Sequence, residues 1–277
     1  MKEQIWQYKE TKIQGVSLAG TYSAYLLPDQ LCCIDVGQGF DWLLNVHQYF
    51  ITHGHMDHAA GIAYIISQKN MRHHPKPQFY MPASLIGPMT QIVRLWSQIE
   101  KFTYDFEFFA LEDFKEISLK PGFKMRPFKT KHRIDSFGFS LIKTHKSLAP
   151  EFQNKNSQAL AELKKKGIPI EIEKEKILIS FSGDTEIEFL DMNPHLYESE
   201  ILFLESTFID DKKTIEQAKT WGHIHFDEII SRLPYIKAEK VLLKHLSGRY
   251  SLNRAEKILD EKLPPAWRQR FEVFPGR

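Results

Sequence analysis

The chain has 277 residues, 42% of them hydrophobic, and a formal net charge of +2 at pH 7. This length allows a substantial buried core, and α/β folds of this size often form one domain, so we expect a single domain over residues 1–277. The small net charge excludes a global electrostatic field that would by itself indicate a nucleic-acid partner. No apolar run approaches the roughly 18 residues of a membrane span, which predicts a soluble protein that makes no membrane contact.

The first fifty residues have the pattern of a β-rich start, with three strands joined by turns between residues 12 and 36. The only cysteines, Cys32 and Cys33, are adjacent inside the third strand. Burial as small hydrophobic residues is favoured there over a strained vicinal disulfide, which suits a reducing, cytoplasmic location. Asp35 ends the same strand, either as a turn-forming residue or as a carboxylate that supports a nearby metal site.

Three histidines and one aspartate lie within six residues after the next predicted strand. In a non-helical turn His53 and His55 point to one side, and Asp57 and His58 face the same spot from the start of a helix. Imidazole and carboxylate groups are the ligands of Zn²⁺ and similar ions, and four such groups could hold more than one ion with help from elsewhere in the chain. The run therefore predicts a metal site.

The middle of the chain alternates predicted strands and helices. His73 and His74 have no carboxylate partner nearby in sequence and are expected at the surface. The aromatic segment 102–109 is either core or an exposed substrate or dimer surface, and we favour core. Residues 143–176 are polar and lysine-rich and are expected to form an insertion outside the core. The elements predicted around these segments are strands at 78–81, 114–119, 123–128, 177–181, 200–204 and 240–244, and helices at 84–99, 157–166, 213–219, 221–231 and 253–263.

Five further polar residues stand at the ends of predicted elements, namely His132, Asp184, Glu205, His223 and His245. Each has a simpler structural explanation when it is taken singly, such as a helix N-cap for Asp184. The segment around His132 is unusually basic. A charge run is usually a solvated face, but next to a candidate ligand it favours a phosphodiester substrate. The basic residues are Lys120, Lys124, Arg126, Lys129, Lys131 and Arg133.

Taken together, five motifs resemble those of the metallo-β-lactamase superfamily and, within it, the ribonuclease Z family. The resemblance spans nearly the whole chain and is closest to the short forms, such as those of plants. It implies an α/β fold, a four-layered αββα sandwich with a dinuclear metal site along one edge. The motifs are His53-x-His-x-Asp-His58, His132-x-x-x-Ser-Phe-Gly-Phe139, Ser182-Gly-Asp-Thr185, the pair Leu204-Glu-Ser-Thr207 and Gly222-His-Ile-His225, and His245-x-Ser-x-Arg-Tyr250.

The same resemblance implies two Zn²⁺ ions, with Mn²⁺ or Fe²⁺ as alternatives. Asp57 would orient or deprotonate the attacking water, and His223, held by Glu205, would protonate the leaving oxygen. His225 competes with His223 for this role. The implied ligands are His53, His55 and His132 for one ion, Asp57, His58 and His245 for the other, and Asp184 as the bridge.

The implied activity is endonucleolytic removal of the 3′ trailer from precursor tRNA by a metal-activated hydroxide. The Gly-Pro-rich arm by which many bacterial members grip the tRNA elbow is not recognisable between residues 143 and 176. Two alternatives therefore stay open, a related phosphodiesterase that acts on small or cyclic nucleotides and a non-catalytic RNA-binding module. The family is commonly dimeric, so we expect a homodimer by resemblance.

Overall fold

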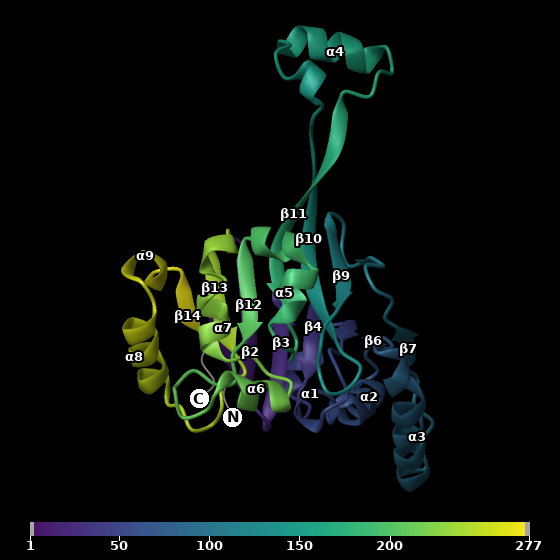
Figure 1. Cartoon of the computed structure of the whole chain (residues 1–277). Coiled ribbons are helices and arrows are strands. Elements are labelled where there is room, and N and C mark those ends of the chain that lie inside the picture. Colours follow the sequence, from purple (N-terminus) through teal and green to yellow (C-terminus); the bar gives the residue numbers. More distant parts are fainter. Residues whose placement is uncertain (1–2, 275–277) are drawn as a thin grey trace.

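Two seven-stranded sheets pack against each other in the middle of the molecule (Figure 1). The computed structural model describes residues 3–274. In both sheets the strands lie side by side in chain order. The first sheet contains β1 (Gln4–Tyr8), β2 (Thr11–Leu18), β3 (Tyr22–Leu27), β4 (Cys32–Val36), β5 (Gln48–Phe50), β6 (Gln78–Met81) and β7 (Glu107–Ala110). The second contains β8 (Ile117–Ser118), β9 (Phe123–Lys129), β10 (Phe137–Leu148), β11 (Glu171–Phe181), β12 (Ile201–Glu205), β13 (Lys240–Lys244) and β14 (Phe271–Val273).

The molecule has four layers, namely helices, the first sheet, the second sheet and helices, and a hydrophobic cluster lies between each pair of neighbouring layers. The central cluster joins the sheets, for example through Tyr25, whose ring contacts Phe181 and Phe203 edge-on at centroid distances of 5.0 and 5.1 Å. A second cluster packs the first sheet against α1–α3, and a third packs the second sheet against α5, α7 and α8. This order of layers confirms the predicted αββα sandwich. The helices are α1 (Met56–Ala59), α2 (Ile62–Met71), α3 (Ala83–Glu100), α4 (Ser157–Lys165), α5 (Glu188–Met192), α6 (Ile215–Thr220), α7 (Phe226–Ile230), α8 (Leu252–Lys262) and α9 (Pro265–Arg268).

The central strands β12 and β13 explain why the sequence indicates this fold clearly. They are parallel neighbours, and their apolar residues are buried on both faces, so they appear as continuous hydrophobic runs. The edge strands β1 and β14 were not predicted. Only Trp6 is buried in β1, and β14 has three residues, so neither strand has a strong pattern.

The aromatic segment 102–109 differs from the expectation of core packing. Tyr104 is buried, but Phe102 and Phe109 are 49% and 38% exposed, so the expectation is wrong for these two side chains. Phe109 lies on β7, the last strand of its sheet, and Phe102 lies in the loop that follows α3. His74 is half-buried and its Nδ1 contacts the carbonyl oxygen of Leu44 at 3.1 Å, whereas His73 lies at the surface as expected.

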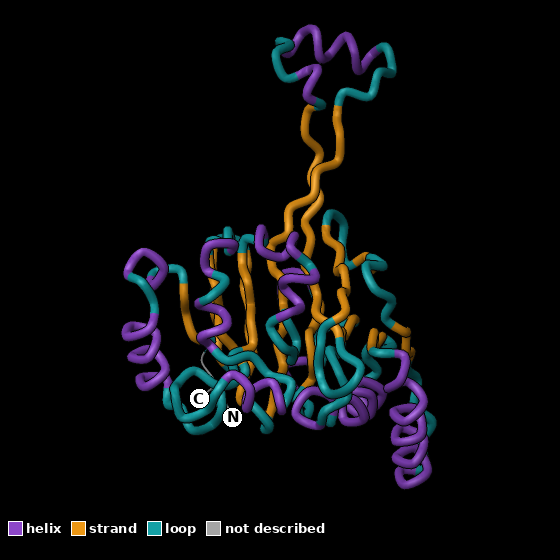
Figure 2. Tube along the Cα trace, in the orientation of Figure 1, coloured by secondary structure: helices purple, strands orange, loops and turns teal. Residues whose placement is uncertain are grey.

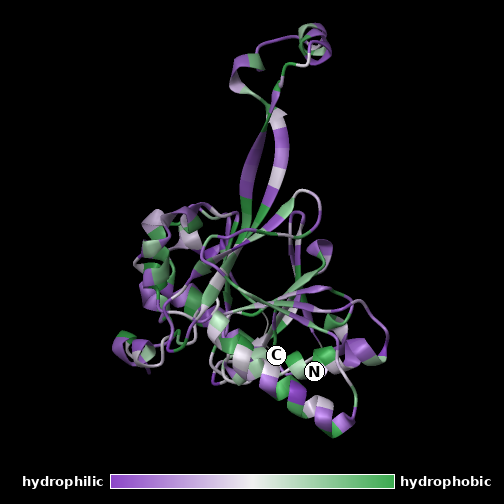
Figure 3. Ribbon diagram, turned by 90° about the vertical axis from the view of Figure 1, so that its right-hand side faces the viewer, coloured by the Kyte–Doolittle hydropathy of each residue, from purple (hydrophilic) through white to green (hydrophobic). Residues whose placement is uncertain are grey.

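β10 and β11 continue beyond the sandwich as a two-stranded arm that carries α4 at its tip (Figures 1 and 2). Strand pairing extends from Lys143 opposite Lys176 to Leu148 opposite Glu171. An arm is therefore present, although its composition is not Gly-Pro-rich. The sequence did not reveal the strands because both faces of the arm are solvated, so neither strand has an alternating apolar face. Figure 3 shows the mostly hydrophilic character of the arm.

No helix within residues 3–274 is both long and apolar enough to cross a lipid bilayer.

Candidate metal centre

The seven predicted ligands converge at one end of the sandwich. They come from four segments, which follow β5, β9, β11 and β13. Ligand atoms lie within 4.8 Å of one another in a group formed by His53, His55 and His132, and in a second group formed by Asp57, His58 and His245. Asp184 lies between the groups, because its carboxylate is within the same distance of His53 and His58, and also of His245.

Four of the five ligand histidines are oriented by a hydrogen bond of the other ring nitrogen. The Nδ1 atoms of His53, His132 and His245 contact the Thr52 hydroxyl at 2.9 Å, the Gly222 carbonyl at 2.8 Å and the Thr207 hydroxyl at 3.1 Å. The Nε2 atoms of these rings are thereby directed into the cluster. His55 is different, since its Nδ1 faces Nε2 of His53 at 3.0 Å and Nε2 of His132 at 3.3 Å. Contacts like those of the Nδ1 atoms of His53, His132 and His245 are typical of metal-binding histidines.

Asp35 supports the segment 53–58, which contains four of the predicted ligands and is called the metal loop below. Its carboxylate accepts hydrogen bonds from the Thr52 amide at 2.8 Å and from Nδ1 of His58 at 2.7 Å. The side chain is completely buried, so these bonds replace its hydration. Of the two explanations that the sequence left open for Asp35, the geometry matches support of the metal loop. Its backbone is also in a left-handed conformation, with φ of 54°.

The electrostatics of the cluster suit divalent cations. Burial lowers the pKa of His53 and of His132, so both imidazoles are neutral at pH 7 and can act as ligands. Burial raises the pKa of Asp184, but His245 and His58 outweigh it and hold this carboxyl ionised. The Oδ1 atom of Asp184 is buried and has no hydrogen-bond partner among the described residues. The other oxygen, Oδ2, faces the Nε2 atoms of His53, His58 and His245 at 3.9, 3.3 and 3.2 Å. A buried carboxylate with this surrounding fits a metal ion well.

The two candidates for the proton donor lie in different environments. Nδ1 of His223 contacts Oε1 of Glu205 at 2.9 Å, so Nε2 is free to face a substrate. His223 is within ligand distance of Asp184 and His245. His225 is turned away, because its Nε2 contacts the Asp210 carbonyl at 3.1 Å and its Nδ1 accepts from the Asp227 amide as the N-cap of α7. This geometry favours His223 as the proton donor.

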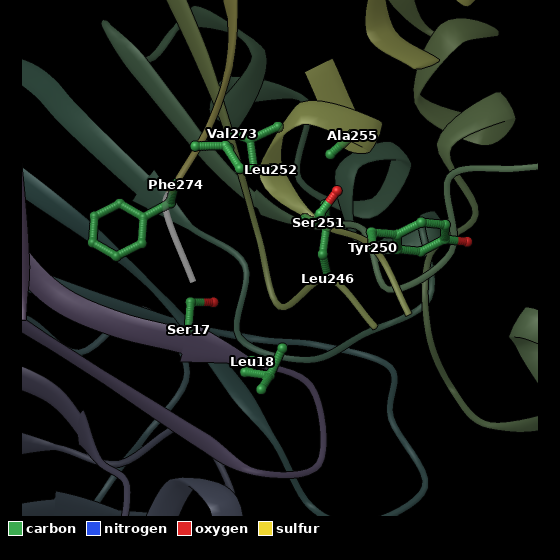
Figure 4. A pocket seen from close by; sticks show the side chains of 9 residues that line it. All are labelled: Ser17, Leu18, Leu246, Tyr250, Ser251, Leu252, Ala255, Val273 and Phe274. Atoms are coloured by element: carbon green, nitrogen blue, oxygen red, sulfur yellow. The ribbon is translucent and has the colours of Figure 1, made fainter. Parts of the chain in front are cut away.

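Several supporting residues were not predicted from the sequence. The Ser17 hydroxyl accepts from the amide of His245 at 2.7 Å, and a small cavity of about 30 Å³ lies between this contact and Phe274 (Figure 4). Lys244 is completely buried, donates to the Gly183 carbonyl at 3.0 Å and lies 3.9 Å from Asp184. The sequence signal that could have identified Lys244 is its position at the end of an apolar strand. A buried lysine is rare unless it has a partner, so a lysine at such a position indicates a nearby acidic or carbonyl group.

The basic run around His132 is mostly neutralised. Lys124 and Arg126 share Glu116 and Glu175, while Lys129 and Lys131 pair with Asp135 and Glu186. These residues form ion pairs with acidic neighbours, which weakens the sequence-based case for a phosphodiester site built on them. Arg133 and Lys120 are the exceptions, because neither forms an ion pair within the described part of the chain, and Lys120 donates to the carbonyl oxygen of Asp29.

Comparison with known proteins identifies the family. Residues 35–258 match the family model described as Anti-Pycsar protein Apyc1. The chain belongs to this family. The Apyc1 family match extends from Asp35 through the last predicted ligand, His245, and therefore includes all seven predicted ligands together with the arm.

Ribonuclease Z proteins are also similar to this Apyc1-family chain. It is 25% identical over 277 residues to tRNase Z TRZ1 of Arabidopsis thaliana, with 99% of each chain covered. In fold it is similar to the human short-form tRNase Z, with a TM-score of 0.61, 17% identity and coverage of 94% and 95% of the two chains. Zn²⁺-bound PqqB of Methylobacterium extorquens has a TM-score of 0.62 at 11% identity, covering 91% and 85%. The resemblance to the ribonuclease Z branch of the metallo-β-lactamase superfamily is confirmed, and the protein is a metal-dependent hydrolase of that superfamily.

Proposed function

We propose that the protein is an endoribonuclease that removes the 3′ trailer from precursor tRNA. The observation that carries the proposal is the presence, in one chain, of the complete ligand cluster and of a long arm whose tip is basic. Residues 149–170 at the tip contain four lysines and two glutamates. A basic element far from the cluster suits a large polyanionic substrate and serves no purpose for a small one.

The chemistry follows from the placement of the chain's own groups. Zn²⁺, Mn²⁺ or Fe²⁺ ions held by the seven ligands would polarise the phosphodiester and activate water for attack. Asp57 accepts a hydrogen bond from the Gly20 amide at 2.9 Å, which fixes its carboxylate to orient the attacking water or take its proton. His223 would donate a proton from Nε2 to the leaving ribose oxygen.

Glu205 prepares His223 for proton donation. Burial lowers the pKa of His223, but the Glu205 carboxylate outweighs burial and raises the pKa above its ordinary value. The carboxylate is itself held by the amides of Thr207 at 3.0 Å and Ile224 at 3.1 Å. A buried, anchored carboxylate therefore orients the imidazole and favours its protonated form.

A second candidate is hydrolysis of a small or cyclic nucleotide diester. The family match keeps it open, because the matching model is described as Anti-Pycsar protein Apyc1 and not as a ribonuclease Z. The same ligands and the same proton donor would serve this reaction. The arm separates the candidates, since only a large RNA would contact it.

A homodimer is part of the proposal. The outer face of α3 exposes large apolar side chains that no other described element covers, and this helix projects beyond the sandwich (Figure 1). Apolar patches of this kind are typical of protein interfaces. A second copy of the chain suits the patch because a two-fold axis would pack α3 against its own equivalent. The exposed residues are Ile92, Leu95, Trp96 and Ile99, with exposed fractions of 44% to 68%.

The test is to incubate the metal-loaded protein with a precursor tRNA and to map the cut. Cleavage immediately after the discriminator base, lost in both His58→Ala and His223→Ala, is the expected result. An intact precursor would contradict the proposal, and hydrolysis of 2′,3′- or 3′,5′-cyclic nucleotides by the same sample would then favour the second candidate.

Truncation of the arm makes the test sharper. Lys146 pairs with Glu173 in the arm, so replacing residues 147–172 by a two-residue turn leaves the sandwich and its strand pairs intact. We expect this variant to keep wild-type activity on a small diester and to lose at least about tenfold in affinity for precursor tRNA. Equal effects on both substrates would argue against a role of the arm in RNA binding.

A further inference from the structure

An exposed tryptophan adjoins the proposed proton donor. Trp221 ends α6 and is separated from His223 by a single glycine, yet 55% of its surface is exposed to solvent. Large aromatic side chains are ordinarily buried to a large extent, and among the described tryptophans only Trp96, on the outer face of α3, is exposed to a similar degree. None of the described hydrophobic clusters includes Trp221, so packing does not explain its presence at this position.

A free arginine lies over the ring of Trp221. The guanidinium carbon of Arg133 is 5.4 Å from the ring centroid, which is within the range of a cation–π contact. Arg133 is exposed and directly follows the predicted ligand His132. Whereas the neighbouring lysines form ion pairs with acidic residues, the charge of Arg133 stays available for an anion.

The chain is built so that these two residues stay together. Gly222 has a φ of 73°, and its carbonyl oxygen accepts the hydrogen bond of Nδ1 of His132. A Cβ atom at Gly222 would lie 2.8 Å from that nitrogen and 3.2 Å from Cγ of Arg133. Only glycine therefore allows the two loops to approach so closely. The same contact orients a predicted ligand and sets Trp221 beside Arg133.

We propose that Trp221 and Arg133 form a nucleotide-binding subsite, in which the indole stacks on an unpaired nucleobase beside the scissile phosphate and the guanidinium binds a neighbouring phosphate. An aromatic face stacks on any base, and an arginine beside it contributes charge and a planar surface. The subsite selects substrates that carry an accessible base next to the cleaved bond. This inference rests on the proposed phosphodiesterase function and specifies which part of the substrate the site recognises.

A second arginine pair supports the same chemistry. Arg249 lies over Phe208 at 5.1 Å, and the Phe208 ring is 6.5 Å from the ring of His223. Phe208 therefore lies near the ring of His223 and carries a guanidinium over its own ring, as Trp221 does two positions before His223 in the chain. Two guanidinium groups on segments next to the proton donor suit a chain of phosphates better than a single anion.

The experiment compares two esters with the same leaving group, the p-nitrophenyl ester of a nucleoside 5′-monophosphate and methyl p-nitrophenyl phosphate. Only the first carries a base. For Trp221→Ala we expect KM to rise about 10- to 100-fold on the nucleoside ester, with kcat and the methyl ester nearly unchanged. Trp221→Phe should restore most of the affinity because it keeps an aromatic face. Tyr235→Ala, which removes another exposed aromatic side chain, is the matched control.

Equal changes on both esters, or no change on either, would overturn the subsite. Binding of a single-stranded RNA trinucleotide gives a readout that does not depend on turnover, and Trp221→Ala should weaken it by a similar factor. Arg133→Ala should weaken it too and lower its dependence on salt concentration, because one phosphate contact is lost. If the wild-type protein hydrolyses the nucleoside ester but leaves precursor tRNA intact, the tRNA proposal fails while the ester comparison still decides the subsite.

Discussion

The Nε2 atoms of His58 and His245 lie 3.4 Å apart, although 187 positions separate these residues in the chain. Asp184 contacts both rings, with its Oδ2 atom 3.3 Å from His58 and 3.2 Å from His245. Three buried groups that would repel or crowd one another in an ordinary core are therefore held together. Their proximity is understandable if a metal ion occupies the space between their lone pairs.

Removing the charge behind the metal loop should weaken metal binding. Asp35→Asn keeps the shape of the side chain and tolerates the left-handed backbone at this position, but it weakens the contact to Nδ1 of His58. We expect zinc affinity to fall about 10- to 100-fold, measured by competition with a chromophoric chelator. Asp41→Asn, at an exposed position, is the control. Unchanged affinity would mean that Asp35 only shapes the turn.

The two histidines of the Gly-His-Ile-His motif should have separable effects. His223→Ala should lower kcat about 10²- to 10⁴-fold and leave the free energy of unfolding nearly unchanged. His225→Ala should do the opposite, since it loses the N-cap of α7 and a bond to the Asp210 carbonyl, at a cost of about 1–3 kcal/mol. Kinetics and chemical denaturation of both variants measure this. A large kcat effect in His225→Ala alone would reverse the assignment.

The pH profile should report the contact between Glu205 and His223. A general acid works only while it is protonated, so activity is lost as the pH rises through the pKa of His223. Because the Glu205 carboxylate raises this pKa, Glu205→Gln should lower it and shift the alkaline limb of the kcat profile to lower pH. An alkaline limb that stays in place would show that another group donates the proton.

Two glycine-to-alanine substitutions should differ in how strongly they change stability. A Cβ atom at Gly61 would lie 2.1 Å from the amide nitrogen of Gly39, so Gly61→Ala must push apart the loops behind the metal site. We expect it to lower the free energy of unfolding by about 1–3 kcal/mol. Gly87 lies inside α3, and a Cβ atom there would meet nothing within 4 Å apart from its chain neighbours and the helix backbone. Alanine has the higher helix propensity, but Pro88 follows and disfavours helical backbone for a residue with a Cβ, so Gly87→Ala should change the free energy of unfolding by less than about 1 kcal/mol. Denaturant titration of both variants tests the pair.

The outer face of α3 predicts the oligomeric state. If it forms the dimer interface, Leu95→Asp or Ile99→Asp places a charge inside the interface and should convert the dimer to a monomer. Light scattering coupled to size exclusion measures the mass. Tyr235→Asp, an exposed aromatic site on η5 (Leu233–Tyr235), is the control. A wild-type protein that is monomeric at micromolar concentration would contradict the homodimer.

The sequence by itself indicated the fold class and predicted the set of candidate ligands, through motifs that resemble those of a known family. The His53–His58 run and the buried parallel strands carry their signals locally, because ligand spacing and continuous apolar runs are properties of short segments. All seven predicted ligands meet in the structure. The sequence pattern did not predict the strands of the arm or the edge strands β1 and β14, because solvated or very short strands lack an apolar face.

Only the tertiary structure decided which polar groups act together. The sequence could not separate His223 from His225, because both follow the same loop and differ only in the partner that each ring meets, Glu205 or the Asp210 carbonyl. Nor could it show that the lysines and Arg126 around His132 find other partners while Arg133 lies over Trp221. Pairing of side chains distant in the chain depends on how the layers pack, and packing is settled by the whole core and not by any one segment.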